Sequence, residues 1–182
     1  MDENEAAVME FRKRKDEFYR SSDPDSPLDQ EEKAVFKGLN YFPYDPRYRV
    51  KARFVPYPDP EQVSMSTSKG ISEVYLRVGY FGFKLMGKDL RLQAYRSPHG
   101  AHSEGYFVPF RDATSGKESY ASARYLDIDE SSRANGNEYW LDFNLAYNPY
   151  CAYTDKYICP FPPEENALNV PIRAGEMKYR EH

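Results

Sequence analysis

Residues 74–94, VYLRVGYFGFKLMGKDLRLQA, decide the fold of this 182-residue chain. A period of two runs from Val74 to Leu85 and returns from Leu90 to Ala94. The residues Gly87-Lys88-Asp89 between the two runs are typical of a tight turn. Because side chains point alternately to the two faces of a strand, this pattern predicts an antiparallel hairpin with one face in the core.

The same pattern extends to both sides of this hairpin. One strand is predicted from Tyr48 to Val55. Another runs from Tyr106 to Thr114, turns at Ser115-Gly116 and returns from Lys117 to Ile128. A further strand is predicted from Glu138 to Asn144. Short connections between neighbouring strands favour an antiparallel meander of six to eight strands.

Two glycines within the central hairpin indicate that the sheet bends. Gly79 and Gly82 interrupt an otherwise regular strand pattern, and such glycines mark bulges or corners in curled sheets. The sequence therefore predicts a mainly β protein, α+β overall, with a strongly curved antiparallel sheet or barrel.

Two helices are predicted before the sheet. Residues 3–20 are amphipathic, because Val8, Phe11, Phe18 and Tyr19 share one side at helical spacing. After the break SSDPDSP, Ser26-Pro27 provides a start signal for a short helix that runs to about Lys37, and Gly38 can close it.

These elements predict a single domain over residues 1–182. Residues 1–25 form an N-terminal helical arm, 26–47 a short helix and loop, and 48–144 the antiparallel sheet. Residues 145–182 are a proline-rich segment, too rich in proline for a helix or a central strand. We expect it to be ordered and to cover one mouth or edge of the sheet.

Charge and hydropathy exclude several function classes. The formal net charge is −4, and a nucleic-acid binder needs a basic face. The basic run 12–15 is interleaved with acids and is typical of a solvated helix face. With no apolar stretch long enough to cross a bilayer and no apolar export signal near the N-terminus, the expected location is cytoplasmic.

The two cysteines do not form a known motif. Cys151 and Cys159 are separated by seven residues, which matches neither a redox C-x-x-C nor a zinc knuckle. A zinc site with His99 and His102, and a cysteine–histidine nucleophile, are weaker alternatives. Between a disulfide and packed thiols, a reducing compartment favours reduced thiols. No metal or cofactor is predicted.

The strand from Glu138 to Asn144 carries the first candidate site residues. One of its faces is apolar and belongs to the core. The other presents Trp140, Asp142 and Asn144, which face either solvent or a polar pocket. The pocket is the more specific interpretation, with Trp140 on its flank.

Two arginines are candidates for binding an acidic group. Arg111 and Arg124 can bind a carboxylate or phosphate through paired N–H donors, and small residues near Tyr120 leave room for a ligand. The alternative is a structural ion pair with Asp112, Asp127 or Asp142, which is the usual environment of a buried arginine.

Taken together, several blocks resemble a prokaryotic family known only as a domain of unknown function. The similarity covers about Phe11 to Glu176. The matching blocks are GLNYFPYDPRYRV, FVPFRDATSGKESY, ARYLD, DFNLAYNPYCAY and CPFPPEENALNVPIRAGE. The resemblance implies no activity and no established catalytic residues. The polar positions that match are Arg111, Asp112, Thr114, Gly116, Tyr120, Arg124, Asp127, Asp142, Asn144, Tyr147, Asn148, Cys151, Tyr153, Cys159, Glu165, Asn166 and Glu176.

This chain departs from the family pattern beside Tyr120. Residues Ala121, Ser122 and Ala123 stand where relatives are richer in glycine, and Tyr150 and Thr154 stand where they are richer in Pro and Asn. Both departures narrow any cavity beside Tyr120.

The sequence supports three functional hypotheses. The first is a small-molecule-binding domain whose polar pocket recognises an acidic or polar ligand. The second is a hydrolase that uses two of Asp112, Asp142 and Glu165 as acid and base. The third is a protein-interaction module with an exposed apolar patch. Whether the chain is an enzyme and what its oligomeric state is stay open. The predicted ligand-binding residues are Arg111, Asp112, Tyr120, Arg124, Trp140, Asp142, Asn144, Tyr147, Asn148, Cys151, Glu165 and Asn166.

Overall fold

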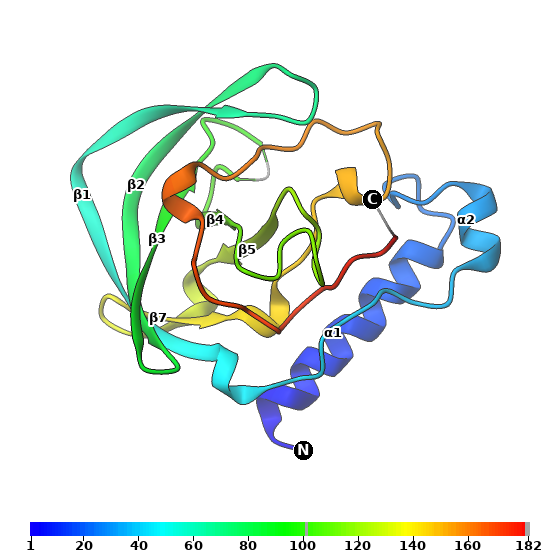
Figure 1. Cartoon of the computed structure of the whole chain (residues 1–182), viewed down its shortest axis with the longest axis horizontal. Helices are drawn as coiled ribbons and strands as arrows, with labels where there is room; N and C mark the ends of the chain where they lie inside the picture. The colour runs from blue at the N-terminus through cyan, green and yellow to red at the C-terminus, as the bar shows by residue number, and fades with distance from the viewer. Residues whose placement is uncertain (101, 181–182) are drawn as a thin grey trace.

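The computed structural model describes residues 1–100 and 102–180, and within them it contains one seven-stranded antiparallel sheet and two α-helices (Figure 1). The strand order is β5-β4-β3-β2-β1-β7-β6. The strands are β1 (Arg49–Ser66), β2 (Ser72–Leu85), β3 (Lys88–Arg96), β4 (Tyr106–Phe110), β5 (Arg124–Ile128), β6 (Arg133–Asn135) and β7 (Glu138–Asp142). The helices are α1 (Glu3–Arg20) and α2 (Gln30–Val35), and the 3₁₀ turns are η1 (Pro46–Tyr48), η2 (Glu130–Ser132), η3 (Phe143–Leu145), η4 (Tyr150–Ala152) and η5 (Glu164–Asn166).

The prediction of a mainly β fold with an antiparallel sheet is confirmed, but the barrel is wrong. The sheet is open and not strongly curled, because its terminal strands β5 and β6 do not pair with each other. The edge of β5 is instead occupied by Tyr147, which exchanges two backbone hydrogen bonds with Tyr125 of 2.8 and 3.1 Å. A short stretch of chain thus protects this edge without closing the sheet.

The predicted strands need correction at four places. β1 continues to Ser66, well beyond the predicted end at Val55. The long hairpin from Tyr106 to Ile128 is strand only at its two ends, because residues 111–123 form turns around Asp112 and Thr114. The three-residue strand β6 was not predicted, and β7 ends at Asp142 rather than at Asn144.

The bulge expected in the central hairpin is present at Gly79. The register of β2 against β3 shifts between Arg77 and Gly79. A Cβ at Gly79 would lie 2.5 Å from the carbonyl oxygen of Val55 and 2.6 Å from the Phe54 ring. Only glycine allows β1 to approach β2 this closely. Gly82 lies in regular strand, so it contributes no bulge.

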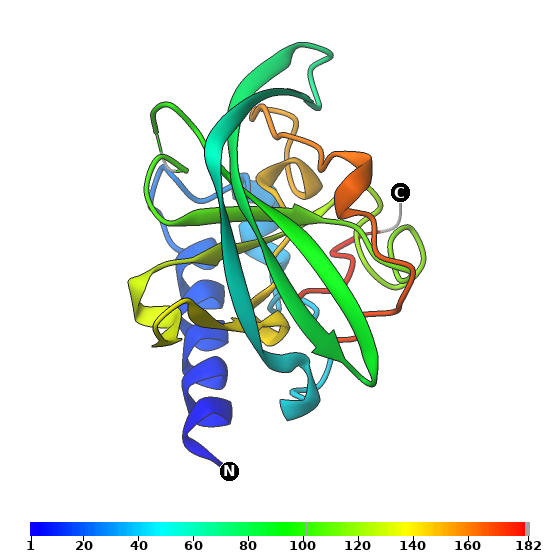
Figure 2. The ribbon, with the colours of Figure 1, turned by 90° about the vertical axis from the view of Figure 1, so that its left-hand side faces the viewer.

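Helix α1 has the predicted limits, and it is packed rather than a free arm. Val8, Arg12 and Tyr19 are buried, and the helix lies on the side of the molecule opposite β1 and β2 (Figures 1 and 2). Helix α2 begins later than predicted: its N-cap is Asp29, which forms a reciprocal capping box with Glu32. In the described chain no helix is both long and apolar enough to cross a membrane.

The main core lies on one face of the sheet. Phe81, Phe83 and Leu92 are buried there, and the proline-rich segment 145–182 adds Leu168 and Ile172. The proline-rich segment therefore contributes to the core through its apolar residues. A second cluster lies on the other face of β4 and β5, where Phe107 and Tyr125 pack with Met65, Tyr75 and Tyr95. Strands β4 and β5 are thus covered on both faces.

Candidate functional site

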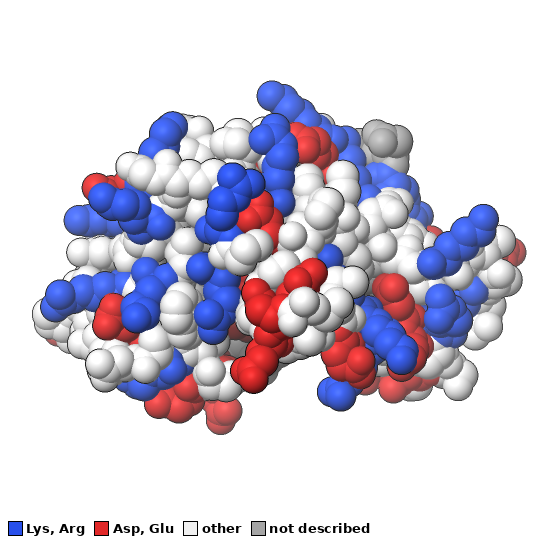
Figure 3. All heavy atoms as spheres, turned by 90° about the horizontal axis from the view of Figure 1, so that it is seen from below, with Lys and Arg blue, Asp and Glu red and all other residues white. Residues whose placement is uncertain are grey.

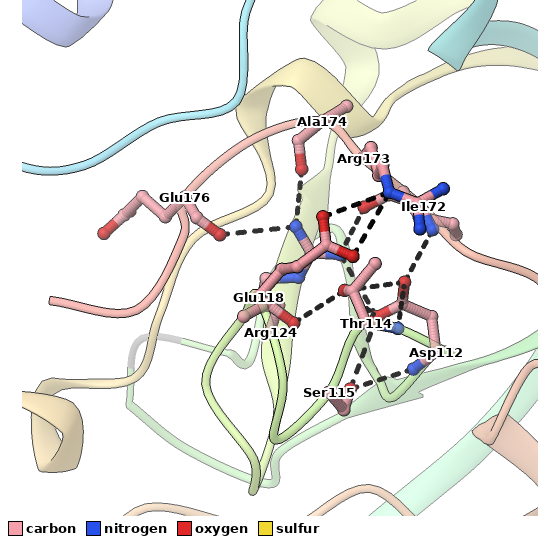
Figure 4. A network of polar contacts seen from close by, with 10 residues as sticks. Asp112, Thr114, Ser115, Glu118, Arg124, Ile172, Arg173, Ala174 and Glu176 are labelled. Atoms are coloured by element: carbon pink, nitrogen blue, oxygen red, sulfur yellow. Dashed lines mark hydrogen bonds and ion pairs between the residues drawn. The ribbon is translucent and has the colours of Figure 1, made fainter. Parts of the chain in front are cut away.

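Arg124 is fully engaged by the protein itself. Its Nη2 lies 3.2 Å from Asp112 Oδ1 and donates to the carbonyl of Ile172 at 2.8 Å. Its Nη1 donates to the carbonyls of Ala174 and Glu176 (Figure 4). The structural ion pair was the alternative to ligand binding, and the structure contains that pair. Through these hydrogen bonds Arg124 holds residues 172–176 of the proline-rich segment in place.

Burial sets the electrostatics of this pair. Both side chains are almost without solvent contact, with 1% and 0% exposure. Desolvation lowers the pKa of Arg124, while the neighbouring Asp112 carboxylate raises it. The other candidate arginine, Arg111, lies near the surface and pairs with Glu164 at 3.3 Å. The two arginines therefore do not converge on one ligand.

Asp142 and Asn144 form a second network. Asn144 Nδ2 donates to Asp142 Oδ1 and to the carbonyl of Asp45, each at 2.9 Å. Asn4 of α1 donates to Asp142 Oδ2 at 2.9 Å. Trp140 lies under Arg49, whose guanidinium carbon is 3.9 Å from the ring centroid. Asp142 and Asn144 therefore connect α1 and the N-cap of η1 to the end of β7.

Glu165 and Asn166 are adjacent in sequence but have separate roles. Glu165 accepts from Arg77 at 2.6 Å and from the Tyr95 hydroxyl. Asn166 is buried, accepts from Gln93 N at 2.8 Å, and donates to the carbonyls of Gln93 and Pro109. Asn166 thus ties η5 to β3 and β4.

The remaining predicted residues lie around the loop after β7. Asn148 is buried and donates to the carbonyl of Met177 at 3.0 Å. Tyr120 is half-buried against the aromatic cluster between α1 and η4. Cys151 is bonded to Cys159, with their Cα atoms 6.3 Å apart. The prediction of reduced thiols is therefore wrong, because the loop between them folds back within disulfide reach.

A large aromatic pocket lies beside the face of β5 that carries Tyr125. Its volume is about 610 Å³. It lies between α1, β5 and the loop that carries the disulfide. Aromatic side chains form most of its wall, and Tyr125 and Tyr147 belong to the second cluster. The lining residues are Phe11, Lys15, Phe18, Tyr19, His102, Tyr125, Asp127, Tyr147, Pro149, Tyr150, Tyr157, Ile158, Cys159 and Pro160.

Asp127 is the carboxylate of this pocket. Its Oδ2 accepts from the Tyr147 hydroxyl at 2.5 Å, and its Oδ1 lies 3.6 Å from Nδ1 of His102. The His102 ring stacks on Phe107 at 3.8 Å between centroids. The Asp127 side chain is 56% exposed, which leaves lone pairs free for a further donor.

Lys15 is the cation of the pocket. Its Nζ lies 2.5 Å from Glu176 Oε2 and 4.9 Å from the Tyr147 ring centroid. Glu176 is buried and accepts a second hydrogen bond from the Tyr153 hydroxyl. The paired carboxylate balances the charge of Lys15, so the ammonium group acts mainly as an oriented donor.

The tyrosines around the pocket are held in their neutral form. Burial raises the pKa of Tyr147 well above its ordinary value, and the adjacent Asp127 charge raises it further. Burial likewise raises the pKa of Tyr19 and of Tyr125. Each hydroxyl therefore stays a hydrogen-bond donor at neutral pH.

Of the predicted site residues, Tyr147 is the one that lines this pocket. Asp127 was named as a possible ion-pair partner of an arginine, and Glu176 as a polar position that matches the family. His102 was named only as a possible zinc ligand, and Lys15 only as part of the basic run on a solvated helix face. The spacing of Phe11, Lys15 and Tyr19 by four residues places them on one side of the predicted helix, and this was the signal available in the sequence. In the structure Phe11 is 44% exposed on that side. Within residues 1–100 and 102–180, no three His, Cys, Asp or Glu side chains are close enough to hold a metal ion.

A solved structure shares this fold along the whole chain. It is the solution NMR structure of an uncharacterized protein of Haloarcula marismortui, with 41% sequence identity and a TM-score of 0.74. The similarity covers 100% of both chains. The comparison with curated proteins gives no match.

A family model also matches most of the chain. It matches residues 34–177 and is described as a protein of unknown function, DUF1684. The matched range contains the whole sheet and the segment that ends at Glu176, whereas α1 lies before it. The chain therefore belongs to the DUF1684 family of proteins of unknown function.

Proposed function

We propose that this chain is a small-molecule-binding protein and that its site is the aromatic pocket between α1, β5 and the disulfide loop. The observation that carries this proposal is a cavity of about 610 Å³ with a largely aromatic wall and few polar groups. Ligand sites are typically apolar hollows of about 300–1,000 Å³ in which a few polar groups fix orientation.

The wall composition indicates a ligand with a flat ring. Tyr19, Tyr125 and Tyr150 offer ring faces and edges, and aromatic pairs gain about 0.5–1.5 kcal/mol beyond area burial. A ring seated there replaces solvent against these side chains. The body of the ligand is therefore a planar, mostly apolar group.

The polar groups indicate a hydrogen-bond donor at one end of this ligand. Asp127 is half-exposed and has free acceptor positions beside Tyr147. Lys15 already neutralises Glu176 and offers no unbalanced positive charge to an acid. Of the predicted acidic or polar ligands, a polar one with a hydroxyl, amide or amine group fits this pocket better.

The hydrolase hypothesis has less support from the geometry. Asp112 neutralises Arg124, and Glu165 binds Arg77 on a different part of the sheet. A pair of catalytic carboxylates must instead converge on one reacting atom. Binding without chemistry is thus the function that the pocket supports best.

A screen of ring-bearing polar molecules tests the proposal directly. Hits are identified by a raised thermal midpoint, since a ligand bound only by the folded state stabilises it. They are then titrated against wild type, Asp127→Asn and the matched control Asp89→Asn, which changes an exposed carboxylate on the β2–β3 hairpin. We expect Asp127→Asn to weaken binding about tenfold.

Two results would contradict the proposal. One is that no molecule of this class shifts the midpoint. The other is that the hits bind Asp127→Asn and wild type equally well, and that the protein amides whose chemical shifts change on binding lie outside α1 and β5. A hit that loses affinity in Asp127→Asn but not in Asp89→Asn supports the pocket.

A further inference from the structure

A separate groove lies on the outer face of the sheet, across β7, β1, β2 and β3. Its volume is about 500 Å³. This face is turned toward the viewer in Figure 2, and Lys and Arg side chains gather on the same side of the molecule at the left of Figure 3. The groove shares no lining residue with the aromatic pocket. Its lining residues are Lys51, Arg53, Val55, Tyr80, Gly82, Phe83, Lys84, Asp89, Leu90, Arg91 and Glu138.

Strand register sets the floor of the groove. Arg53 of β1 and Arg91 of β3 are both register partners of Gly82 on the strand between them. With about 4.8 Å between strands, the two arginine Cα atoms stand roughly 10 Å apart across the glycine. A Cβ built on Gly82 would meet the Tyr80 ring at 3.7 Å, an ordinary contact distance, so the position is not crowded and a side chain placed there would stand between the two arginines.

Three of the four cations that line the groove form no ion pair within the described part of the chain. Among the described residues, Lys51, Arg53 and Arg91 take part in no ion pair, and Lys84 lies 3.8 Å from the exposed Asp89. Aromatic rings hold two of these side chains. The Arg91 guanidinium carbon is 4.4 Å from the Tyr80 centroid, and Lys51 Nζ is 5.3 Å from Trp140. Exposed cations gathered on a protein of net charge −4 form a local positive field.

We propose that this groove binds a small multivalent anion, such as a molecule with two phosphoryl groups. The planar donors of Arg53 and Arg91 suit phosphoryl oxygens, and Gly82 lets the anion approach the strand. Carboxylates limit the groove, with Glu138 beside Arg53 and Asp89 beside Lys84. These acids disfavour a long polyanion that would have to pass over them.

The test uses inorganic pyrophosphate as the probe, titrated calorimetrically and by amide chemical shifts on the full chain. The decisive variant is Gly82→Val, which places a side chain between Arg53 and Arg91 without changing any charge. We expect it to weaken binding at least about tenfold, and Arg91→Ala to do the same. The matched control Lys88→Ala removes an exposed cation at the hairpin end and should change affinity less than about twofold.

Wild-type binding should also weaken as salt rises, since the groove is exposed. An unchanged amide spectrum outside the groove shows that Gly82→Val is folded. The proposal is overturned if folded Gly82→Val binds pyrophosphate as wild type does, or if Lys88→Ala weakens binding equally. It is also overturned if a single-stranded oligonucleotide binds with an affinity that grows with its length, because that identifies a polymer site.

Discussion

Arg124 and Asp112 form a buried ion pair, with Nη2 of Arg124 3.2 Å from Oδ1 of Asp112. The pair lies where the β4–β5 connection contacts the proline-rich segment 145–182. Asp112 also accepts from the backbone N–H of Ile172 at 2.6 Å. Arg124 donates to three carbonyls of the same segment. The two residues together replace the regular sheet pairing that a proline-rich chain cannot make.

The first prediction concerns the removal of this pair. Arg124→Met should lower the free energy of unfolding by about 3–5 kcal/mol, because it leaves a buried carboxylate without its partner. Urea denaturation measures the loss. Arg111→Met is the control: it breaks an exposed pair with Glu164 and should cost less than about 1 kcal/mol. Equal losses in both variants would show that burial does not set the strength of the Arg124 pair.

The second prediction concerns Asn166. Asn166→Ala removes hydrogen bonds to Gln93 N, Gln93 O and Pro109 O. It should destabilise the chain by about 2–4 kcal/mol, since an unsatisfied buried polar group costs about 1–3 kcal/mol. Asn169→Ala, at an exposed position of the same segment, should change stability by less than about 0.5 kcal/mol. Similar denaturation midpoints for both variants would contradict the assignment.

The third prediction is a loss of stability at high pH. Burial raises the pKa of Tyr19, Tyr125 and Tyr147 in the folded chain. An unfolded tyrosine releases its proton near pH 10, whereas these folded ones keep theirs. The folded state then binds more protons, so its stability is fully present below about pH 10 and falls as the pH rises further.

Denaturation series between about pH 8 and 11.5 measure this loss, with tyrosinate absorbance as the readout. Each retained proton contributes a slope of at most about 1.4 kcal/mol per pH unit. Tyr147→Phe removes one of the tyrosines whose pKa burial raises and should give a shallower decline. A decline as steep as in wild type would exclude Tyr147 from the effect.

The fourth prediction concerns the Cys151–Cys159 bond. The double variant with Ser at both positions should lose about 2–3 kcal/mol, because the bond closes a short loop in the unfolded chain. Dithiothreitol should have the same effect on wild type and none on the double variant. Thiol alkylation and mass spectrometry of the freshly purified protein establish whether the bond is formed. Free thiols without any stability difference would contradict it.

The sequence predicts those parts of the fold that depend on local periodicity. Helix α1 has its predicted limits, and the hairpin of β2 and β3 lies where a period of two indicated it. The failure at residues 111–123 has a definite cause. That stretch consists mostly of small and polar residues, and most of its hydrogen bonds within the chain segment go to Asp112 and Thr114. Side-chain turn chemistry there overrides strand propensity.

The site was less predictable, because its contacts are long-range. The partners of Asn166 on β3 are 73 residues away, so its neighbours in sequence gave no indication of its role. Arg124 was recognised as either a ligand-binding or a structural cation, and its partner Asp112 was among the options. Nothing local distinguishes those outcomes, since burial and pairing depend on the completed fold.

The position of α1 has a consequence for how ligand preference can diverge. Phe11, Lys15 and Tyr19 form one wall of the aromatic pocket, and they precede residues 34–177, which the family model matches. The opposite wall, with Tyr125 and Asp127, is formed by strand β5. Substitutions confined to α1 would therefore change one wall of the pocket, and with it the ligand that fits, while the strands that form the other wall stay as they are.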